Sequence, residues 1–145
     1  MNIEAILASK GREVSTIRPE TLIAEAIRRM RQERISALVV SEDGATIAGI
    51  LSDRGIMNTI ADQGIAVVEQ SVRAAMTAEV FTCSPGDRIG AIMAAMTARR
   101  IRHIPVVEED GRLCGIVSIG DVVKDRMDEL ETETKVLHEY IAHGR

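Results

Sequence analysis

The sequence contains almost no aromatic residues. Among its 145 residues only Phe81 and Tyr140 are aromatic and there is no tryptophan, whereas hydrophobic residues make up 46% and charged residues 28%. A globular core in this chain must therefore consist of aliphatic side chains and methionine. The scarcity also argues against binding of single-stranded nucleic acid, because proteins of that class stack bases on aromatic side chains.

The sequence also lacks a basic excess and a long apolar run. Its net charge is -4, whereas nucleic-acid binding depends on a basic surface. The basic cluster at residues 28–34 is interleaved with Gln32 and Glu33, which favours a solvated helix face over a nucleic-acid contact. No segment has the length of a membrane span, and no signal-peptide core is present. We expect a soluble, cytoplasmic protein that neither binds nucleic acid nor inserts into a membrane.

Residues with catalytic or metal-binding spacing are lacking as well. The two cysteines, Cys83 and Cys114, lie in apolar runs without metal-ligand spacing, which predicts reduced core thiols. There is no Ser/His/Asp order, no Cys/His constellation, no P-loop and no metal cluster. The sequence therefore predicts no enzyme activity, no catalytic residue and no metal site.

An internal repeat is the main feature that is present. Residues 14–57 align without a gap on residues 80–123, at a constant offset of 66, and twelve of the 44 pairs are identical. Two copies in a chain of this length predict two halves of one globule rather than a solenoid. We assign residues 1–66 to a first repeat with a lead-in helix, and residues 67–145 to a second repeat with an extended C-terminal helix.

Each repeat reads as strand, helix, strand, strand, helix, which is an α+β fold. In the first repeat we expect a lead-in helix at 2–9, strands at 14–17, 37–40 and 46–51, and helices from residues 21 and 52. In the second we expect a lead-in helix at 72–77, strands near residue 80 and at 103–107 and 113–117, and helices at 87–99 and from 118. Asp87 is the expected N-cap of the helix at 87–99. Because Pro105 cannot donate a ladder hydrogen bond, its strand should lie at an edge or border an opening.

The last expected helix, at residues 121–143, carries a heptad seam. Its apolar positions advance by four and three residues in turn: Val123, Met127, Leu130, Thr134, Leu137 and Ile141. An isolated helix of this length is marginal in water. The seam therefore docks on another chain or folds back on its own chain, and of these we favour a homodimer.

Two motifs carry a resemblance to a known family. The strand motif is Arg102-His103-Ile104-Pro105-Val106-Val107, and the strand-to-helix motif is Gly115-Ile116-Val117-Ser118-Ile119-Gly120-Asp121. Together with the tandem repeat they resemble a pair of cystathionine β-synthase (CBS) domains, also called a Bateman module. The resemblance implies one compact globule of two repeats related by a pseudo-twofold axis.

The resemblance also implies a function. Members of this family are regulatory or sensor units whose clefts bind adenosyl ligands, which here would be AMP, ADP or ATP, with NAD and S-adenosylmethionine as further possibilities. No cofactor is obligatory, and the regulated protein would be a separate, unknown polypeptide. The alternative is a protein–protein interaction or assembly module with vestigial nucleotide sites.

Ser118 and Asp121 are the leading candidates for ligand contacts. A carboxylate at a helix start can accept the two hydroxyl groups of a ribose, and Ser118 lies where the helix N-terminus favours phosphate oxygens. The alternative is that Ser118 is only an N-cap and Asp121 its first-turn acid.

The remaining candidates follow from the resemblance. It implies that Arg102 and His103 contact the ligand phosphates, although His103 can equally be a strand-end histidine without a ligand. It places the adenine against Ile104, Pro105 and the Val80 strand, with Thr77 near the entrance.

The first repeat departs from the pattern at two matched positions. Ala37 stands where the second repeat has His103, and Gly55 stands where it has Asp121. We therefore predict one competent site, built mainly from the second repeat. The first site is predicted to be empty, structural or of different specificity.

Overall fold

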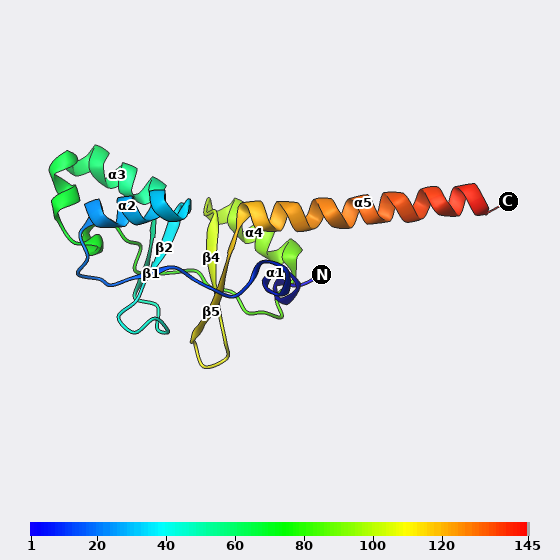
Figure 1. Cartoon of the computed structure of the whole chain (residues 1–145), viewed down its shortest axis with the longest axis horizontal. Coiled ribbons are helices and arrows are strands. Elements are labelled where there is room, and N and C mark those ends of the chain that lie inside the picture. The colour runs from blue at the N-terminus through cyan, green and yellow to red at the C-terminus, as the bar shows by residue number, and fades with distance from the viewer. Residues whose placement is uncertain (145) are drawn as a thin grey trace.

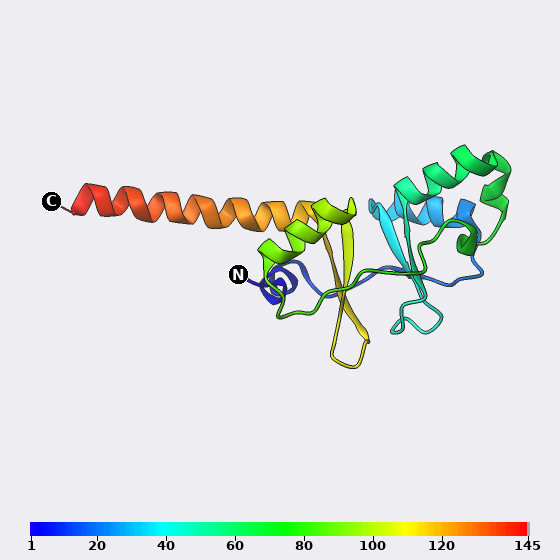
Figure 2. The same ribbon diagram turned by 180° about the vertical axis from the view of Figure 1, so that it is seen from behind.

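The computed structural model describes residues 1–144, which form two repeat units side by side with a long helix extending from the second (Figure 1). Figure 2 shows the same arrangement from behind. The elements in chain order are α1 (Ile3–Lys10), β1 (Thr16–Ile17), α2 (Ile23–Glu33), β2 (Ala37–Val40), β3 (Gly49–Ser52), α3 (Asp53–Gln63), the 3-10 turns η1 (Ile65–Glu69) and η2 (Val72–Ala74), α4 (Ile89–Arg99), β4 (His103–Val107), β5 (Leu113–Ser118) and α5 (Ile119–His143). This order confirms the predicted α+β fold with a long C-terminal helix.

Each of the two repeats has its own aliphatic core. The first includes Ile17, Ile23, Ala26, Met30, Leu38, Val40, Leu51, Ile56, Val67 and Val72. The second includes Ile3, Ile6, Leu7, Cys83, Ile89, Ile92, Met96, Ile104, Val106, Val117 and Val122. Each core contains a methionine and no aromatic residue among its buried members, which agrees with the composition. Both cysteines are free thiols, Cys83 buried and Cys114 half-buried.

The lead-in segments pack on the opposite repeats. Helix α1 precedes the first repeat in the chain, yet Leu7 lies in the core of the second repeat. Its N-terminal turn is held there because the amides of Ile3 and Glu4 donate to the carbonyls of Asp87 and Pro85, at 2.9 and 2.8 Å. Conversely, Val72 lies in the first core. The ranges 1–66 and 67–145 remain a predicted division of the sequence, because the packing interleaves them.

The two sheets differ by one strand, and Pro105 explains the difference. In the first repeat β1 pairs with β2 in parallel, and the amide of Val39 donates to the carbonyl of Ser15 at 3.1 Å. Pro105 is the equivalent of Val39 at the offset of 66 and has no amide hydrogen to donate. The second repeat therefore keeps only an isolated bridge between Cys83 and Val106 beside the β4–β5 hairpin. Pro105 thus borders an unpaired segment just before Cys83, which corresponds to the predicted opening. Val80, for which a strand was expected, lies in no strand.

Four further predictions need correction. Strand β3 begins at Gly49 and not at residue 46, because the Asp43 carboxylate accepts the amides of Ala45 and Thr46 and holds them in a loop. Strand β1 is shorter than residues 14–17. The expected helix at 72–77 is only the short turn η2. The N-cap of α4 is Arg88, without a side-chain hydrogen bond, since the Asp87 carboxylate accepts the amide of Ser84 instead.

Helix α5 is mostly solvent-exposed. Of its 25 residues only Val122 is buried, and its packing partners are α1, α4 and β5 near its N-terminal end. The remainder projects beyond the globule (Figures 1 and 2). None of the helices in residues 1–144 combines the length and apolar character required to cross a membrane.

Candidate ligand-binding site

The start of α5 is a complete capping box. The amide of Asp121 donates to the Ser118 hydroxyl at 3.2 Å, and the amide of Ser118 donates to Oδ2 of Asp121 at 2.9 Å. These reciprocal bonds satisfy two amides that the first helical turn leaves unpaired. Helix capping alone therefore accounts for both residue types, as the alternative interpretation stated. A ligand role for them needs additional observations.

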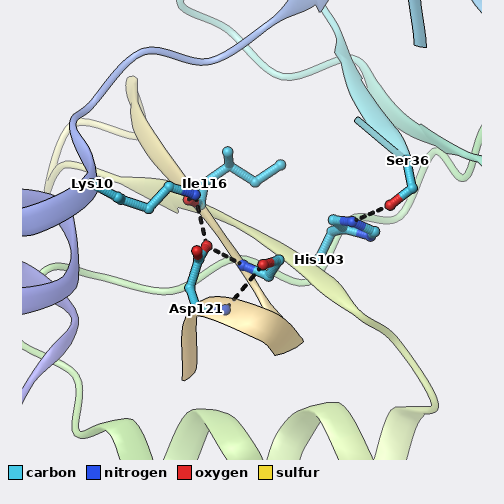
Figure 3. A network of polar contacts seen from close by, with 6 residues as sticks. Lys10, Ser36, His103, Ile116 and Asp121 are labelled. Carbon is cyan, nitrogen blue, oxygen red and sulfur yellow. Dashed lines mark hydrogen bonds and ion pairs between the residues drawn. The ribbon is translucent and has the colours of Figure 1, made fainter. Parts of the chain in front are cut away.

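One such observation is an ion pair between Asp121 and Lys10. The ammonium group of Lys10 lies 2.7 Å from Oδ2 of Asp121 and also donates to the carbonyl of Ile116 at 3.0 Å (Figure 3). Burial acts to raise the pKa of the Asp121 carboxyl, but the hydrogen bonds from Lys10 and Ser118 outweigh burial and hold that pKa below its usual value. Asp121 is therefore ionised at neutral pH.

Lys10 was not among the predicted site residues. It ends α1, and 111 residues separate it from Asp121 in the sequence. Its neighbour Gly11 marks only a helix end, and no residue pattern near it indicates that α1 crosses to the second repeat. The contact follows from the exchange of lead-in segments, which only the structure reveals.

Beside this ion pair lies a pocket that we call the second-repeat pocket. It has a volume of about 220 Å³ and is lined by Lys10, Arg34, Ile35, Ser36, Ala37, His103, Ile116 and Ser118. The lining comes from both repeats. Asp121 is not a lining residue, but its carboxylate bonds Lys10 and Ser118, which both line the pocket. The pocket thus joins two cations to a helix N-terminus, an arrangement suited to an anion.

His103 forms part of the boundary between the repeats. Its Nε2 lies 2.9 Å from the Ser36 hydroxyl, and Figure 3 shows the two side chains pointing toward one another. Burial lowers the pKa of His103, and the charge of Arg102 lowers it further, whereas Asp53 and Asp121 act in the opposite direction. The imidazole is therefore neutral at pH 7 and acts as a hydrogen-bonding group rather than a cation.

The internal repeat produces another pocket, equivalent to the second-repeat pocket, which we call the first-repeat pocket. It has a volume of about 250 Å³ and is lined by Ile50, Ser52, Arg54, Thr77, Glu79, Val80, Phe81, Arg99, Arg100, Ile101, Arg102 and His103. Several lining residues of the two pockets are equivalent at the offset of 66: Ile50 and Ile116, Ser52 and Ser118, Arg100 and Arg34, Ile101 and Ile35, Arg102 and Ser36, His103 and Ala37.

The predicted site residues are divided between these two pockets, whereas the sequence predicts all of them at the one competent site. Thr77, Val80 and Arg102 line the first-repeat pocket, Ser118 lines the second-repeat pocket, and His103 reaches both. The cause is the pairing of Thr77 with Ile50 in the first repeat, where each amide donates to the carbonyl of the other at 2.9 and 3.0 Å. The segment that follows Thr77 therefore runs beside β3 and not beside β5.

Ile104 and Pro105 need a separate correction. Both side chains are buried in strand β4, and neither lines either of these two pockets. They cannot provide a surface for an adenine in this arrangement. Pro105 acts instead through its missing amide, which leaves the neighbouring segment of the first-repeat pocket unpaired.

Arginines that the sequence interpretation missed dominate the first-repeat pocket. Arg54, Arg99 and Arg100 line it together with Arg102, which forms an ion pair with Asp53 at 2.5 Å. The Arg99 guanidinium lies 4.2 Å above the ring of Phe81. The identity of Arg34 and Arg100 in the repeat was a usable signal, because each of them reaches one of the two pockets.

Arg34 and Arg100 also share an unusual backbone conformation. Within residues 1–144 they are the two non-glycine residues with positive φ, at 55° and 54°, and each forms the left-handed C-cap of its helix. This conformation costs a non-glycine residue on the order of 1 kcal/mol. Glycine would avoid that cost, yet both repeats have arginine here, and each of these arginines lines one of the two pockets.

Comparison with known proteins gives consistent matches. The family described as CBS domain matches residues 9–62 and 72–128. The Arabidopsis thaliana protein named "CBS domain-containing protein CBSX3, mitochondrial" is 33% identical over 150 residues, which span 98% of this chain and 72% of that protein. The crystal structure of a CBS-domain containing protein from Agrobacterium tumefaciens is 41% identical, covers 87% of this chain and 99% of its own, and superimposes with a TM-score of 0.83.

A more distant solved structure shares the fold. The crystal structure of CBSX2 in complex with AMP is 21% identical, covers 79% of this chain and 88% of its own, and has a TM-score of 0.69. The two matched segments coincide with the two repeats, and each contributes the strand-to-helix junction at which a pocket begins. This protein therefore belongs to the CBS domain family and carries a tandem pair of CBS domains.

Proposed function

We propose that this protein is a non-catalytic sensor module that binds an adenine nucleotide in the second-repeat pocket and passes the bound state to a separate protein. The observation that carries the proposal is the Lys10–Asp121 ion pair at the helix N-terminus that borders this pocket. This ion pair places the Lys10 ammonium group, which can bind phosphate, in direct contact with the Asp121 carboxylate, which can accept the ribose hydroxyls. The AMP complex of the related CBSX2 structure supports this ligand class.

The Asp121 carboxylate keeps one oxygen for a ligand. In the described part of the chain, the hydrogen bonds from Lys10 and Ser118 both end on Oδ2. Oδ1 is then the acceptor for a ribose hydroxyl, and a charged acceptor gives such a bond about 1.5–3 kcal/mol. The capping box fixes this carboxylate before the ligand arrives, so little conformational freedom is lost on binding.

Phosphate would contact the cationic wall of the pocket. Lys10 and Arg34 provide two positive charges, and Ser118 provides a hydroxyl group at the helix start. The volume of about 220 Å³ lies below the roughly 300–1,000 Å³ of pockets that hold drug-sized ligands. A nucleotide must therefore displace the Lys10 side chain from Asp121, so that the ammonium group moves onto the phosphate.

The first-repeat pocket is proposed to have a different specificity. Position 55 is glycine, so this pocket has no counterpart of Asp121, whereas four arginines line it. Such a site favours the phosphate groups of a ligand over its ribose. A ligand with several phosphate groups, such as ATP, fits this pocket better than AMP.

Isothermal titration with AMP, ATP, NADH and S-adenosylmethionine tests the proposal. Wild-type protein should bind at least one adenine nucleotide, and Asp121→Asn should weaken that binding about 10- to 100-fold, as expected for loss of a charged acceptor. Asp128→Asn is a matched control, because Asp128 is an exposed carboxylate on the same helix away from both pockets. It should leave the affinity unchanged.

Two results would contradict the proposal. If none of the four ligands binds, the protein is an interaction or assembly module with vestigial sites, an alternative that the exposed seam of α5 favours. If binding survives Asp121→Asn but is lost in Arg99→Gln with Arg100→Gln, the first-repeat pocket is the nucleotide site.

The proposed signal is a change in the placement of the two repeats. The second-repeat pocket is lined by Ser36 and Ala37 of the first repeat and by Ile116 and Ser118 of the second. A ligand that contacts both sides can favour one relative placement over another, which is the requirement for regulation. Small-angle scattering with and without nucleotide should then differ, and identical curves at saturation would argue against this mechanism.

A further inference from the structure

The part of α5 beyond its first turns exposes a continuous apolar stripe. Met127, Leu130, Leu137 and Ile141 are between 45% and 60% exposed, although residues of this kind are usually buried. The helix projects away from the globule in both views (Figures 1 and 2). Helices in proteins gain most of their stability from packing an apolar face rather than from intrinsic propensity, so the stripe needs a covering surface.

The spacing of the stripe identifies the form of that surface. With Val123 assigned to heptad position d, Met127, Thr134 and Ile141 occupy a positions, and Leu130 and Leu137 occupy d positions. Alternating steps of four and three keep all six on one face of a left-handed coiled coil. A shallow hollow beside this seam, lined by Met127, Leu130, Glu131, Thr134, Lys135 and His138, can receive side chains of a second helix.

We propose that α5 pairs with α5 of a second copy of this chain as a parallel, in-register, two-stranded coiled coil. The charges that flank the seam select this partner and this direction. In a parallel pair, a g residue lies near the e residue five positions later in the partner helix. This rule places Arg126 opposite Glu131, which is a favourable charge pair, and Glu133 opposite His138, whose ring N–H can donate to the carboxylate.

The antiparallel arrangement places like charges together. Full overlap of the seam in that direction pairs Met127 with Leu137, which brings Glu131 against its own copy and Glu133 against its own copy. It also brings Lys124 near His138. Two carboxylate pairs face each other in this arrangement, so it is disfavoured relative to the parallel one. In the single chain Arg126 bonds Glu129 at 3.0 Å, and this exposed contact can be exchanged for Glu131 of the second copy.

The heptad register explains further features of the helix. Asp128 and Lys135 fall at b positions and Asp125 and Glu139 at f positions, on the side turned away from the seam. Because the seam begins at Val123, directly after the capping box at Ser118 and Asp121, the parallel pair brings the N-terminal ends of the two α5 helices together. The two globules would then lie at the same end of the coiled coil.

Disulfide trapping in the full-length chain tests the direction. The background variant is Cys114→Ser, because Cys114 is half-buried, whereas Cys83 is buried and burial raises the pKa of its thiol to about 12. In a parallel dimer the two copies of Leu137 face each other at a d position. Leu137→Cys should then form an intermolecular disulfide on mild oxidation, since facing positions satisfy the required Cα separation.

Two cysteine variants serve as matched controls. Glu139→Cys, at an f position on the outer side of the same helix turn, should not form the disulfide. A mixture of Met127→Cys and Leu137→Cys should give no mixed disulfide in a parallel dimer. In the antiparallel arrangement those two positions face each other, and the two copies of position 137 are about 15 Å apart along the axis.

Charge reversal tests the pairing that sets the direction. Arg126→Glu and Glu131→Arg should each weaken dimerisation about tenfold, because each change makes two repulsive contacts per dimer. The double variant should regain most of the lost affinity in sedimentation equilibrium. All of these residues are exposed in the single chain, so the variants should fold.

The outcomes separate clearly. A monomer in sedimentation equilibrium, a mixed disulfide between positions 127 and 137, or a dimer that forms without the Leu137→Cys disulfide would each overturn the proposal. Failure of the double charge reversal to restore affinity would also contradict the assigned register.

Discussion

The ammonium group of Lys10 lies 2.7 Å from the Asp121 carboxylate, which ties the end of α1 to the start of α5. These residues are 111 positions apart in the sequence, and their contact holds α1 against the second repeat. The ion pair is only partly shielded, with about a quarter to a third of each side chain exposed. It therefore contributes modestly to stability, while it fixes the charges that border the second-repeat pocket.

Asp121→Asn should lower stability mainly at neutral pH. The native pKa of this carboxyl is below its usual value, so the stabilisation exists above the unfolded pKa and is lost as pH falls through the native pKa. We expect a loss of about 0.5–1.5 kcal/mol at pH 7, and a smaller difference from wild type near pH 3. Urea denaturation at both pH values measures it, with Asp128→Asn as the control. An equal loss at both pH values would show that charge is not the cause.

Wild-type stability should also fall when the pH drops below about 6.5, because of His103. Burial and the charge of Arg102 lower the native pKa of His103, with Lys10 adding to this effect and Asp53 and Asp121 opposing it. The unfolded chain therefore takes up the proton first, and stability decreases as pH falls from the unfolded pKa to the native pKa.

His103→Gln should flatten this part of the pH profile in chemical denaturation between pH 7.5 and 5.5. His143→Gln is the matched control, because His143 is exposed at the end of α5, outside both pockets and the seam, and it should leave the slope unchanged. A slope that is the same in wild type and His103→Gln would assign the pH dependence to other groups.

Much of the fold could be predicted from the sequence because the relevant signals are local. The hairpin turns and the apolar spacing of α2 and α4 each act over a few residues, and the 66-residue offset shows each of these patterns a second time. The structure confirms the elements they predicted. The wrong prediction of Asp87 as an N-cap and the late start of β3 have the same cause, which is that a carboxylate can bond other nearby amides. Asp43 and Asp87 bond loop amides instead of helix or strand amides.

The site was less predictable because it depends on which segments cross between repeats. The motif predicted Ser118 and Asp121 as site residues, but it does not reveal that Lys10 reaches Asp121. It likewise does not reveal that Thr77 and Val80 lie beside β3. Lys10, Thr77 and Val80 are far in sequence from the residues they approach, and in a chain with two similar repeats a lead-in segment can pack on either repeat. The residues predicted for one competent site therefore lie at two pockets in the structure.

Pro105→Val should restore the strand pairing that the second repeat lacks. Valine occupies the equivalent position 39, where its amide donates to Ser15 at 3.1 Å. The new amide at position 105 would donate to the carbonyl of Phe81, the equivalent of Ser15. It should then show slow hydrogen exchange, comparable with Val39 in the same molecule, which serves as an internal reference.

The net change in stability from Pro105→Val should be small. A new backbone hydrogen bond contributes about 0.5–1.5 kcal/mol, while the loss of proline gives the unfolded chain about 0.4–1 kcal/mol of added entropy. Because Phe81 lines the first-repeat pocket, its fixation should also narrow that pocket. Rapid exchange at the new amide would show that the missing bond is not the cause of the unpaired segment.

The equivalent glycines Gly49 and Gly115 begin the same motif in both repeats, and each lies under a lead-in segment. A Cβ at Gly49 would be 2.9 Å from the carbonyl oxygen of Thr77 and 2.7 Å from the sulfur of Met76. A Cβ at Gly115 would be 2.6 Å from a terminal methyl of Leu7. Neither glycine has a positive φ, so the requirement is close approach and not backbone conformation.

Gly49→Ala should therefore destabilise the protein more than Gly115→Ala. A backbone carbonyl that is paired with Ile50 cannot move without loss of hydrogen bonds, whereas the Leu7 side chain can change rotamer within its core. Overpacking costs about 1–3 kcal/mol, and we expect Gly49→Ala at the upper end and Gly115→Ala at the lower end. Thermal and urea denaturation of the two variants measure the difference. Because the offset of 66 makes the positions equivalent, each is the control for the other, and equal losses would mean that the Thr77 backbone yields as readily as a side chain.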